Sequence, residues 1–197
     1  MSNTENITSF STVAERTSAE VPKDWADAAR TCVYQILAYF KDGGTGEIKD
    51  LRGYIDYVID QMGPGSKSFV GTVKAAEFWR TFGSLAARAG KKNNIFKDFP
   101  DEGPELLELV NQITDILVRK QRDYGHENIA RFGRAGLLVR SHDKVARLEN
   151  LLTSGRVPEN ESVVDNFIDV IGYSAIGMMW ERQWFLLDLP AAETEKK

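Results

Sequence analysis

The segment 161–187 constrains the fold most, because it is the most apolar stretch of the chain that also follows helical spacing. Its apolar side chains leave little exposed face on a helix. They are Val163, Val164, Phe167, Ile168, Val170, Ile171, Ile176, Met178, Met179 and Trp180. We therefore expect a helix over 161–187 that is largely buried.

Five further segments carry apolar residues at helical spacing and are separated by glycine or proline breaks. They cover about residues 24–43, 46–62, 72–89, 104–124 and 135–153. Between the last two of these, residues 126–136 predict a short helical turn or an ordered loop. No segment alternates with a period of two, so the predicted fold class is all-α, a helical bundle of about six helices.

Composition divides the chain into four parts. Residues 1–21 are rich in Ser, Thr, Asn and Glu, which predicts a flexible arm. The polar run at 91–94 is typical of a linker and predicts a boundary between an N-terminal helical region, 22–100, and a second helical domain, 101–190. Residues 191–197 form a charged tail.

The overall charge excludes some classes of partner. The chain of 197 residues carries a net charge of -4, which argues against a protein that binds duplex nucleic acid through a general basic surface. No apolar stretch reaches the roughly 18 residues of a membrane span, so no membrane partner is expected. The amino end lacks the pattern of a signal peptide, and the expected location is the cytoplasm.

Three acids, Glu161, Asp165 and Asp169, recur every four residues along the apolar helix. Like charges at this spacing destabilise a helix, and buried acids need a counter-charge. Oxygen ligands without His or Cys suit Mg²⁺ or Mn²⁺, so the row predicts a divalent metal site. A solvated acidic face is the alternative.

The preceding helix offers one more carboxylate, Asp143, together with Arg140, Lys144 and Arg147. Arg and Lys side chains beside a metal site are typical of proteins that bind phosphate groups. The alternative is an ordinary i,i+4 ion pair between Asp143 and Arg147.

The end of the helix at 104–124 contributes Lys120, Asp123 and Tyr124, and Asn128 follows in the loop. Lysine near a helix C-terminus and the glycine at 125 are explained in part by helix capping. A tyrosine and an amide that precede an acidic helix predict contacts with a nucleotide base or sugar.

The order and spacing of these residues resemble the nucleotide modification associated domain 1 family, which is common in bacteriophages. The match covers the C-terminal part of the chain, from about residue 101. It rests on Lys120-x-x-Asp123-Tyr124-Gly125, Asn128, Phe132-Gly133, Arg140-x-x-Asp143-Lys144-x-x-Arg147-Leu148-x-Asn150-Leu151-Leu152 and Glu161-Ser162-x-x-Asp165-x-x-x-Asp169-x-x-Gly172-Tyr173. That family is similar to the all-α, MazG-like nucleoside triphosphate pyrophosphohydrolases, which bind Mg²⁺ and cut between the α- and β-phosphates.

The resemblance implies a dimeric, Mg²⁺-dependent enzyme that converts an NTP or dNTP to the monophosphate and pyrophosphate. It would act in the host cytoplasm if it is phage-encoded. The implied catalytic residues are Asp143, Glu161 and Asp165, and the implied metal ligands are these three with Asp169. The implied substrate-binding residues are Lys120, Asp123, Tyr124, Asn128, Arg140, Lys144 and Arg147.

One departure from the MazG-like pattern leaves other functions open. Where those enzymes carry several glutamates on one helix, this chain has Asp143 with Lys144 and Arg147. A non-catalytic nucleotide-binding or regulatory module is therefore an alternative. Another is a helical interaction protein whose acids are simply paired with Arg140, Lys144 and Arg147.

Overall fold

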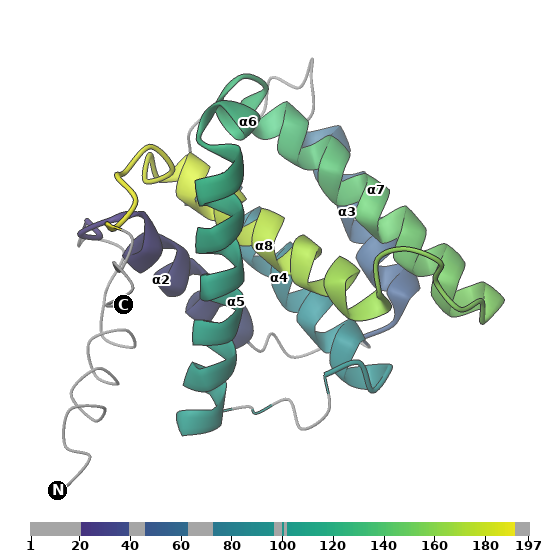
Figure 1. The fold of residues 1–197 in the computed structure, drawn as a ribbon. Coiled ribbons are helices and arrows are strands. Elements are labelled where there is room, and N and C mark those ends of the chain that lie inside the picture. Colours follow the sequence, from purple (N-terminus) through teal and green to yellow (C-terminus); the bar gives the residue numbers. More distant parts are fainter. Residues whose placement is uncertain (1–20, 40–45, 63–72, 97–99, 101, 192–197) are drawn as a thin grey trace, which may run out of the picture.

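The computed structural model describes residues 21–39, 46–62, 73–96, 100 and 102–191, and over these residues it contains seven α-helices and no strand. The all-α prediction is confirmed (Figure 1). The helices are α2 (Trp25–Leu37), α3 (Ile48–Met62), α4 (Val73–Lys92), α5 (Pro104–Tyr124), α6 (Glu127–Ala130), α7 (Gly133–Ser154) and α8 (Val163–Glu181). The predicted arm and tail lie outside the described residues, apart from Val21 and Ala191.

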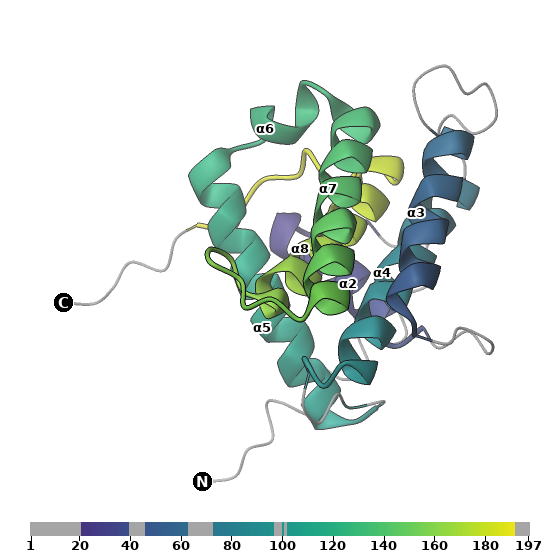
Figure 2. The same ribbon diagram turned by 90° about the vertical axis from the view of Figure 1, so that its right-hand side faces the viewer.

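Helix α8 runs through the middle of the molecule, as its apolar sequence requires (Figure 1). It packs most extensively on α4, and also on α7 and α2. Figure 2 shows α5 on one side of this centre and α3 on the other. The short α6 lies in the predicted turn, between α5 and α7.

The contact between α4 and α8 depends on a glycine. A Cβ atom placed on Gly177 would lie 2.3 Å from the ring of Trp79, which is fully buried. Trp79 therefore packs against α8 only because position 177 has no side chain. Trp79 belongs to the same core as Phe167, so helices on both sides of residue 100 share one hydrophobic core.

The third predicted helix, about 72–89, is too short at its C-terminal end, because α4 continues to Lys92. Gly90 instead makes room for Phe96, whose ring would lie 2.3 Å from a Cβ at position 90. Asn94, two residues after the end of α4, has a positive φ of 56°. The amide of Ile95 bonds to the carbonyl of Gly90 at 2.9 Å, in the pattern of a Schellman motif.

Helix α8 is shorter than the predicted segment 161–187 at both ends. It stops at Glu181 because Gln183 takes a positive φ of 61° and the amide of Trp184 bonds to the carbonyl of Met179. It begins at Val163 because Ser162 is its N-cap. Glu161 therefore precedes the helix.

None of the helices in the described part of the chain combines the length and apolar character needed to cross a membrane.

Candidate functional site

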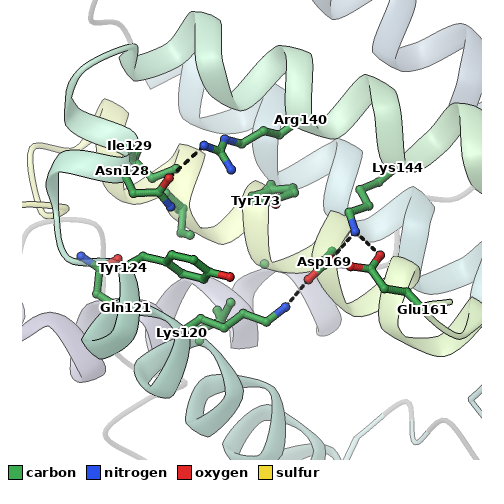
Figure 3. Close-up of a pocket in the computed structure, with 13 residues that line it drawn as sticks. Lys120, Gln121, Tyr124, Asn128, Ile129, Arg140, Lys144, Glu161, Asp169 and Tyr173 are labelled. Carbon is green, nitrogen blue, oxygen red and sulfur yellow. Dashed lines mark hydrogen bonds and ion pairs between the residues drawn. The ribbon is translucent and has the colours of Figure 1, made fainter.

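A cavity of about 200 Å³ opens between α5, α6, α7 and the middle of α8 (Figure 3). Helix α5, which lines one side of the cavity, packs more extensively on α2 than on α8. Its lining residues are Leu117, Lys120, Gln121, Tyr124, Asn128, Ile129, Arg140, Lys144, Glu161, Asp169, Gly172, Tyr173 and Ile176.

Apolar side chains from three helices line part of the cavity: Leu117 of α5, Ile129 of α6 and Ile176 of α8. At Gly172, a Cβ would lie 2.6 Å from the Cδ2 atom of Leu117. This glycine therefore permits α5 and α8 to meet at the wall of the cavity. Without it, Leu117 would have to move.

Asp169 is the centre of a charge network inside the cavity. Its side chain is only 10% exposed, and it forms ion pairs with Lys120 and with Lys144, whose Nζ atom lies 2.8 Å from Oδ2. Lys144 also pairs with Glu161 at 2.5 Å. Two carboxylates, one from before α8 and one from within it, thus converge on one ammonium group (Figure 3).

This network changes the pKa of Lys144. Burial lowers the pKa of the ammonium group, but hydrogen bonds and charge attraction from Asp169 and Glu161 outweigh burial and raise it above the ordinary lysine value. Lys144 is therefore a fixed positive charge at neutral pH.

Arg147 holds Glu161 from the side of α7. One guanidinium nitrogen donates to the backbone carbonyl of Glu161 at 3.0 Å, and the other lies 3.4 Å from its carboxylate. Arg147 does not line the cavity. It supports the cavity by positioning Glu161.

The opposite end of the cavity carries aromatic and amide groups. Arg140 of α7 donates to the Oδ1 atom of Asn128 at 2.9 Å. The Tyr124 side chain stands at the edge of the cavity and is 66% exposed. Figure 3 shows Gln121, Tyr124 and Asn128 at this end, away from Lys144 and Glu161.

Seven of the eleven predicted site residues line this one cavity. They are Lys120, Tyr124, Asn128, Arg140, Lys144, Glu161 and Asp169. Arg147 is not a lining residue, but it donates a hydrogen bond to Glu161, which is one. Asp123 is exposed and lies outside its lining.

The remaining two, Asp143 and Asp165, lie outside the lining of the cavity. The Asp143 side chain is 74% exposed and lies 3.8 Å from His142. Asp165 completes a capping box, in which its carboxylate accepts from the Ser162 amide at 3.0 Å and hydroxyl at 2.7 Å. These bonds lower the pKa of Asp165. The metal-binding and catalytic roles of both aspartates stay predictions.

Of the three acids, Asp165 and Asp169 lie four residues apart in α8, whereas Glu161 is not part of the helix. Glu161 lies before the helix, Asp165 is exposed at the cap and Asp169 is buried. Glu161 lies before the helix because the Ser162 cap starts α8 two residues after it. Among the residues that the structure describes, no three His, Cys, Asp or Glu side chains are grouped as metal ligands.

Sequence reasoning missed two polar residues of the lining, Gln121 and Tyr173. Both had a signal in the sequence. Gln121 stands four residues after Leu117, where the buried face of α5 continues, and it is 5% exposed. Tyr173 stands four residues after Asp169 and so shares its face of α8.

Neither a family model, nor a curated protein, nor a solved structure matches this chain. The resemblance to the nucleotide modification associated domain 1 family therefore stays a prediction.

Proposed function

We propose that the cavity binds a nucleoside or deoxynucleoside triphosphate. The observation that carries this proposal is the pairing of a cationic end with an apolar, tyrosine-bearing end in one cavity. A nucleotide has the same two parts, since its phosphates are anionic and its base is a flat, largely apolar ring. Ligand sites typically combine apolar walls with a few placed polar groups.

In this proposal the phosphates bind at the end of the cavity that contains Lys120 and Lys144. Both lysines already bind a carboxylate of Asp169, so they are placed to bind anionic oxygens. The Lys120 side chain is 48% exposed and has room to follow an incoming phosphate group. Arg140 adds a third cation to the lining. Phosphate binding would replace some of the ion pairs of Lys120 and Lys144 with charge-assisted hydrogen bonds to the ligand.

The base and sugar bind at the end of the cavity that contains Tyr124 and Asn128. The tyrosine ring offers a face for stacking, and Leu117 with Ile129 supplies an apolar wall for the base. The amide of Asn128 is held by Arg140 and contributes a directed hydrogen bond. A ligand that bridges both ends contacts α5, α6, α7 and α8 together.

Isothermal titration calorimetry with a panel of triphosphates, with and without Mg²⁺, tests this proposal. We expect saturable one-site binding by the wild type and at least about tenfold weaker binding by Lys120→Met, since a charge-assisted bond is lost. Lys49→Met, which removes an exposed lysine of α3, is the control and should bind as the wild type does. Equal affinities for Lys120→Met and the wild type, or no binding by any nucleotide, contradict the proposal.

A second candidate function, Mg²⁺-dependent pyrophosphohydrolysis, is supported by the convergence of Glu161 and Asp169 on the Lys144 ammonium. Mg²⁺ is commonly held by one or two carboxylates together with substrate phosphates, so this pair of oxygen donors fits the ion. When bound, the ion supplies charge neutralisation and orients a water molecule for attack on the α-phosphorus. Lys120 would hold the phosphates in place.

Product analysis separates this function from binding alone. We expect wild-type protein with Mg²⁺ to release a monophosphate and pyrophosphate, and Glu161→Gln to lose turnover by at least about a hundredfold. Glu108→Gln is the matched control and should retain turnover, because Glu108 is exposed on α5 and lies outside the cavity lining. Binding without any product assigns the chain to the non-catalytic alternative. The expected dimer is measured on the same samples by light scattering.

A further inference from the structure

A groove of about 260 Å³ lies between α3 and α7. Its lining is apolar apart from one histidine and consists of Ile59, Ala135, Leu138, Val139 and His142. Figure 2 shows α3 and α7 side by side on the face of the molecule toward the viewer. Val139 is 62% exposed, which leaves apolar surface of the groove in contact with solvent. The groove shares no lining residue with the cavity that contains Lys144 and Asp169.

Phe132 places an exposed aromatic ring on the same side of α7. It is the N-cap residue of the helix and is 64% exposed. It lies against Gly136, because a Cβ at that position would lie 2.8 Å from the Cβ of Phe132. Gly136 and Val139 are three residues apart and are therefore neighbours on the helix surface. An exposed apolar strip thus runs along α7 from Phe132 to the groove, as is typical of an interaction surface.

Opposite charges flank the ring and the groove. Arg131, which is exposed, directly precedes Phe132. At the groove, His142 lies 3.8 Å from the carboxylate of Asp143, whose side chain is 74% exposed. The ring therefore has a cation beside it, and the groove has an anion at its edge. The ring and the groove are complementary to each other in shape and in charge.

The spacing of these residues fits two copies of α7 in antiparallel contact. With the crossing point at the level of position 137, Arg131 and Asp143 are equally far from it, at about 9 Å along the helix axis. Phe132 and His142 are also equally far from it, at about 7.5 Å. An antiparallel pair therefore sets Arg131 of one copy opposite Asp143 of the other. It also sets Phe132 of one copy opposite the groove of the other.

We propose that this face of α3 and α7 binds a second copy of the chain, with the Phe132 ring of each copy in the groove of the other. The groove is large enough, since a cavity of roughly 150 Å³ holds a benzene molecule. Every contact then occurs twice, as in the self-complementary interface of a two-fold dimer. Exposed ion pairs add little affinity but oppose a mismatched pairing. The ring therefore supplies the affinity, and Arg131 with Asp143 fixes the orientation.

Sedimentation equilibrium of the wild type and of two serine variants tests this interface. We expect a wild-type dimer, and a dissociation constant at least about tenfold higher for Phe132→Ser, since an aromatic anchor is lost. Leu186→Ser is the matched control and should associate as the wild type does, because Leu186 is 66% exposed but lies after α8. A wild type that stays monomeric at all concentrations, or equal association of the two variants, overturns the proposal.

Charge reversal tests the orientation of the two copies. Arg131→Glu sets two acids opposite each other, and Asp143→Arg sets two cations opposite each other. Each single variant should therefore have a dissociation constant at least about tenfold higher than the wild type. The double variant restores opposite charges and should associate within about threefold of the wild type. A double variant that associates no better than either single variant overturns the antiparallel pairing, and with it the interface.

Discussion

The ammonium nitrogen of Lys144 lies 2.8 Å from the Oδ2 atom of Asp169, and both side chains are largely buried, at 17% and 10% exposed. This ion pair joins α7 to α8 across the cavity. It therefore contributes to the fold and also lies in the lining of the cavity where we propose that a nucleotide binds.

Replacing Asp169 with Asn should destabilise the protein, because Lys120 and Lys144 would lose a charged acceptor in a partly buried place. We expect a loss of about 1–3 kcal/mol in the free energy of unfolding, measured by urea denaturation. Asp143→Asn makes the same change at a side chain that is 74% exposed, and should stay within about 0.5 kcal/mol of wild type. Equal effects at the two positions would contradict the structural role of the ion pair.

Replacing Lys144 with Met should create a metal site that does not need a nucleotide. In the wild type the ammonium group stands between Glu161 and Asp169, so a divalent ion must compete with it. We expect Mn²⁺ affinity in the absence of nucleotide to rise at least about tenfold in Lys144→Met, since the two carboxylates lose a competing cation. Titration followed by electron paramagnetic resonance of free Mn²⁺ measures this.

The exposed lysine of α3 again provides the control, because Lys49→Met should leave Mn²⁺ affinity unchanged. If Lys144→Met binds Mn²⁺ no better than the wild type, Glu161 and Asp169 do not form a cation site.

Helical spacing predicted most of the bundle and most of the cavity lining, because both depend on residues three or four positions apart. Lys120 and Tyr124 share a face of α5, and Arg140 and Lys144 share a face of α7. Which face of α7 meets α8 depends on packing with other helices. Asp143 is adjacent to Lys144 and so points about 100° away from it, toward solvent.

The remaining differences between the predicted and the observed helices lie at the helix ends. Asn94 and Gln183 end α4 and α8 with positive φ angles, a conformation that sequence reasoning assigns first to glycine. The glycines of the bundle often serve packing instead, as Gly90 does beside Phe96. Ser162 and Asp165 have the spacing of a capping box. A helix predicted to begin at Glu161 places Ser162 inside the helix, where it cannot act as the N-cap.

The Asp165 cap should give a pH-dependent contribution to stability. Its pKa is lowered in the folded protein from 3.8, chiefly by the hydrogen bond from Ser162. Because the folded pKa is the lower one, the stabilisation is complete above the unfolded value and is lost as the pH falls through the folded value. Asp165→Ala should therefore lose about 0.5–1 kcal/mol at pH 7, and this difference should shrink as the pH falls below the unfolded value of 3.8.

A double-mutant cycle locates the cause of that effect. Ser162→Ala removes the hydroxyl that bonds to Asp165 at 2.7 Å, so the effects of the two substitutions should be less than additive. Fully additive effects would show that Asp165 does not stabilise the protein through the Ser162 cap. A stability loss in Asp165→Ala that is the same at neutral and acidic pH would show this too.

Two glycine-to-alanine substitutions test the packing of the core in opposite directions. Gly177→Ala places a Cβ 2.3 Å from the Trp79 ring, and should destabilise the protein by about 1–3 kcal/mol. Gly53 lies inside α3, and a Cβ added there would have no neighbouring atom within 4 Å, so Gly53→Ala should stabilise the protein by about 0.5–1 kcal/mol. Thermal unfolding of both variants measures the two effects. A Gly177→Ala variant as stable as the wild type would contradict the packing of α4 on α8.

Nucleotide binding between α5, α7 and α8 is tested most directly by mapping backbone amide shifts in ¹H–¹⁵N spectra during titration with UTP and Mg²⁺. We expect the largest shifts in residues 117–129, 140–147 and 161–176, and small shifts in α2 and α3. The absence of shifts at saturating nucleotide, or shifts centred on α3, would contradict nucleotide binding in this cavity.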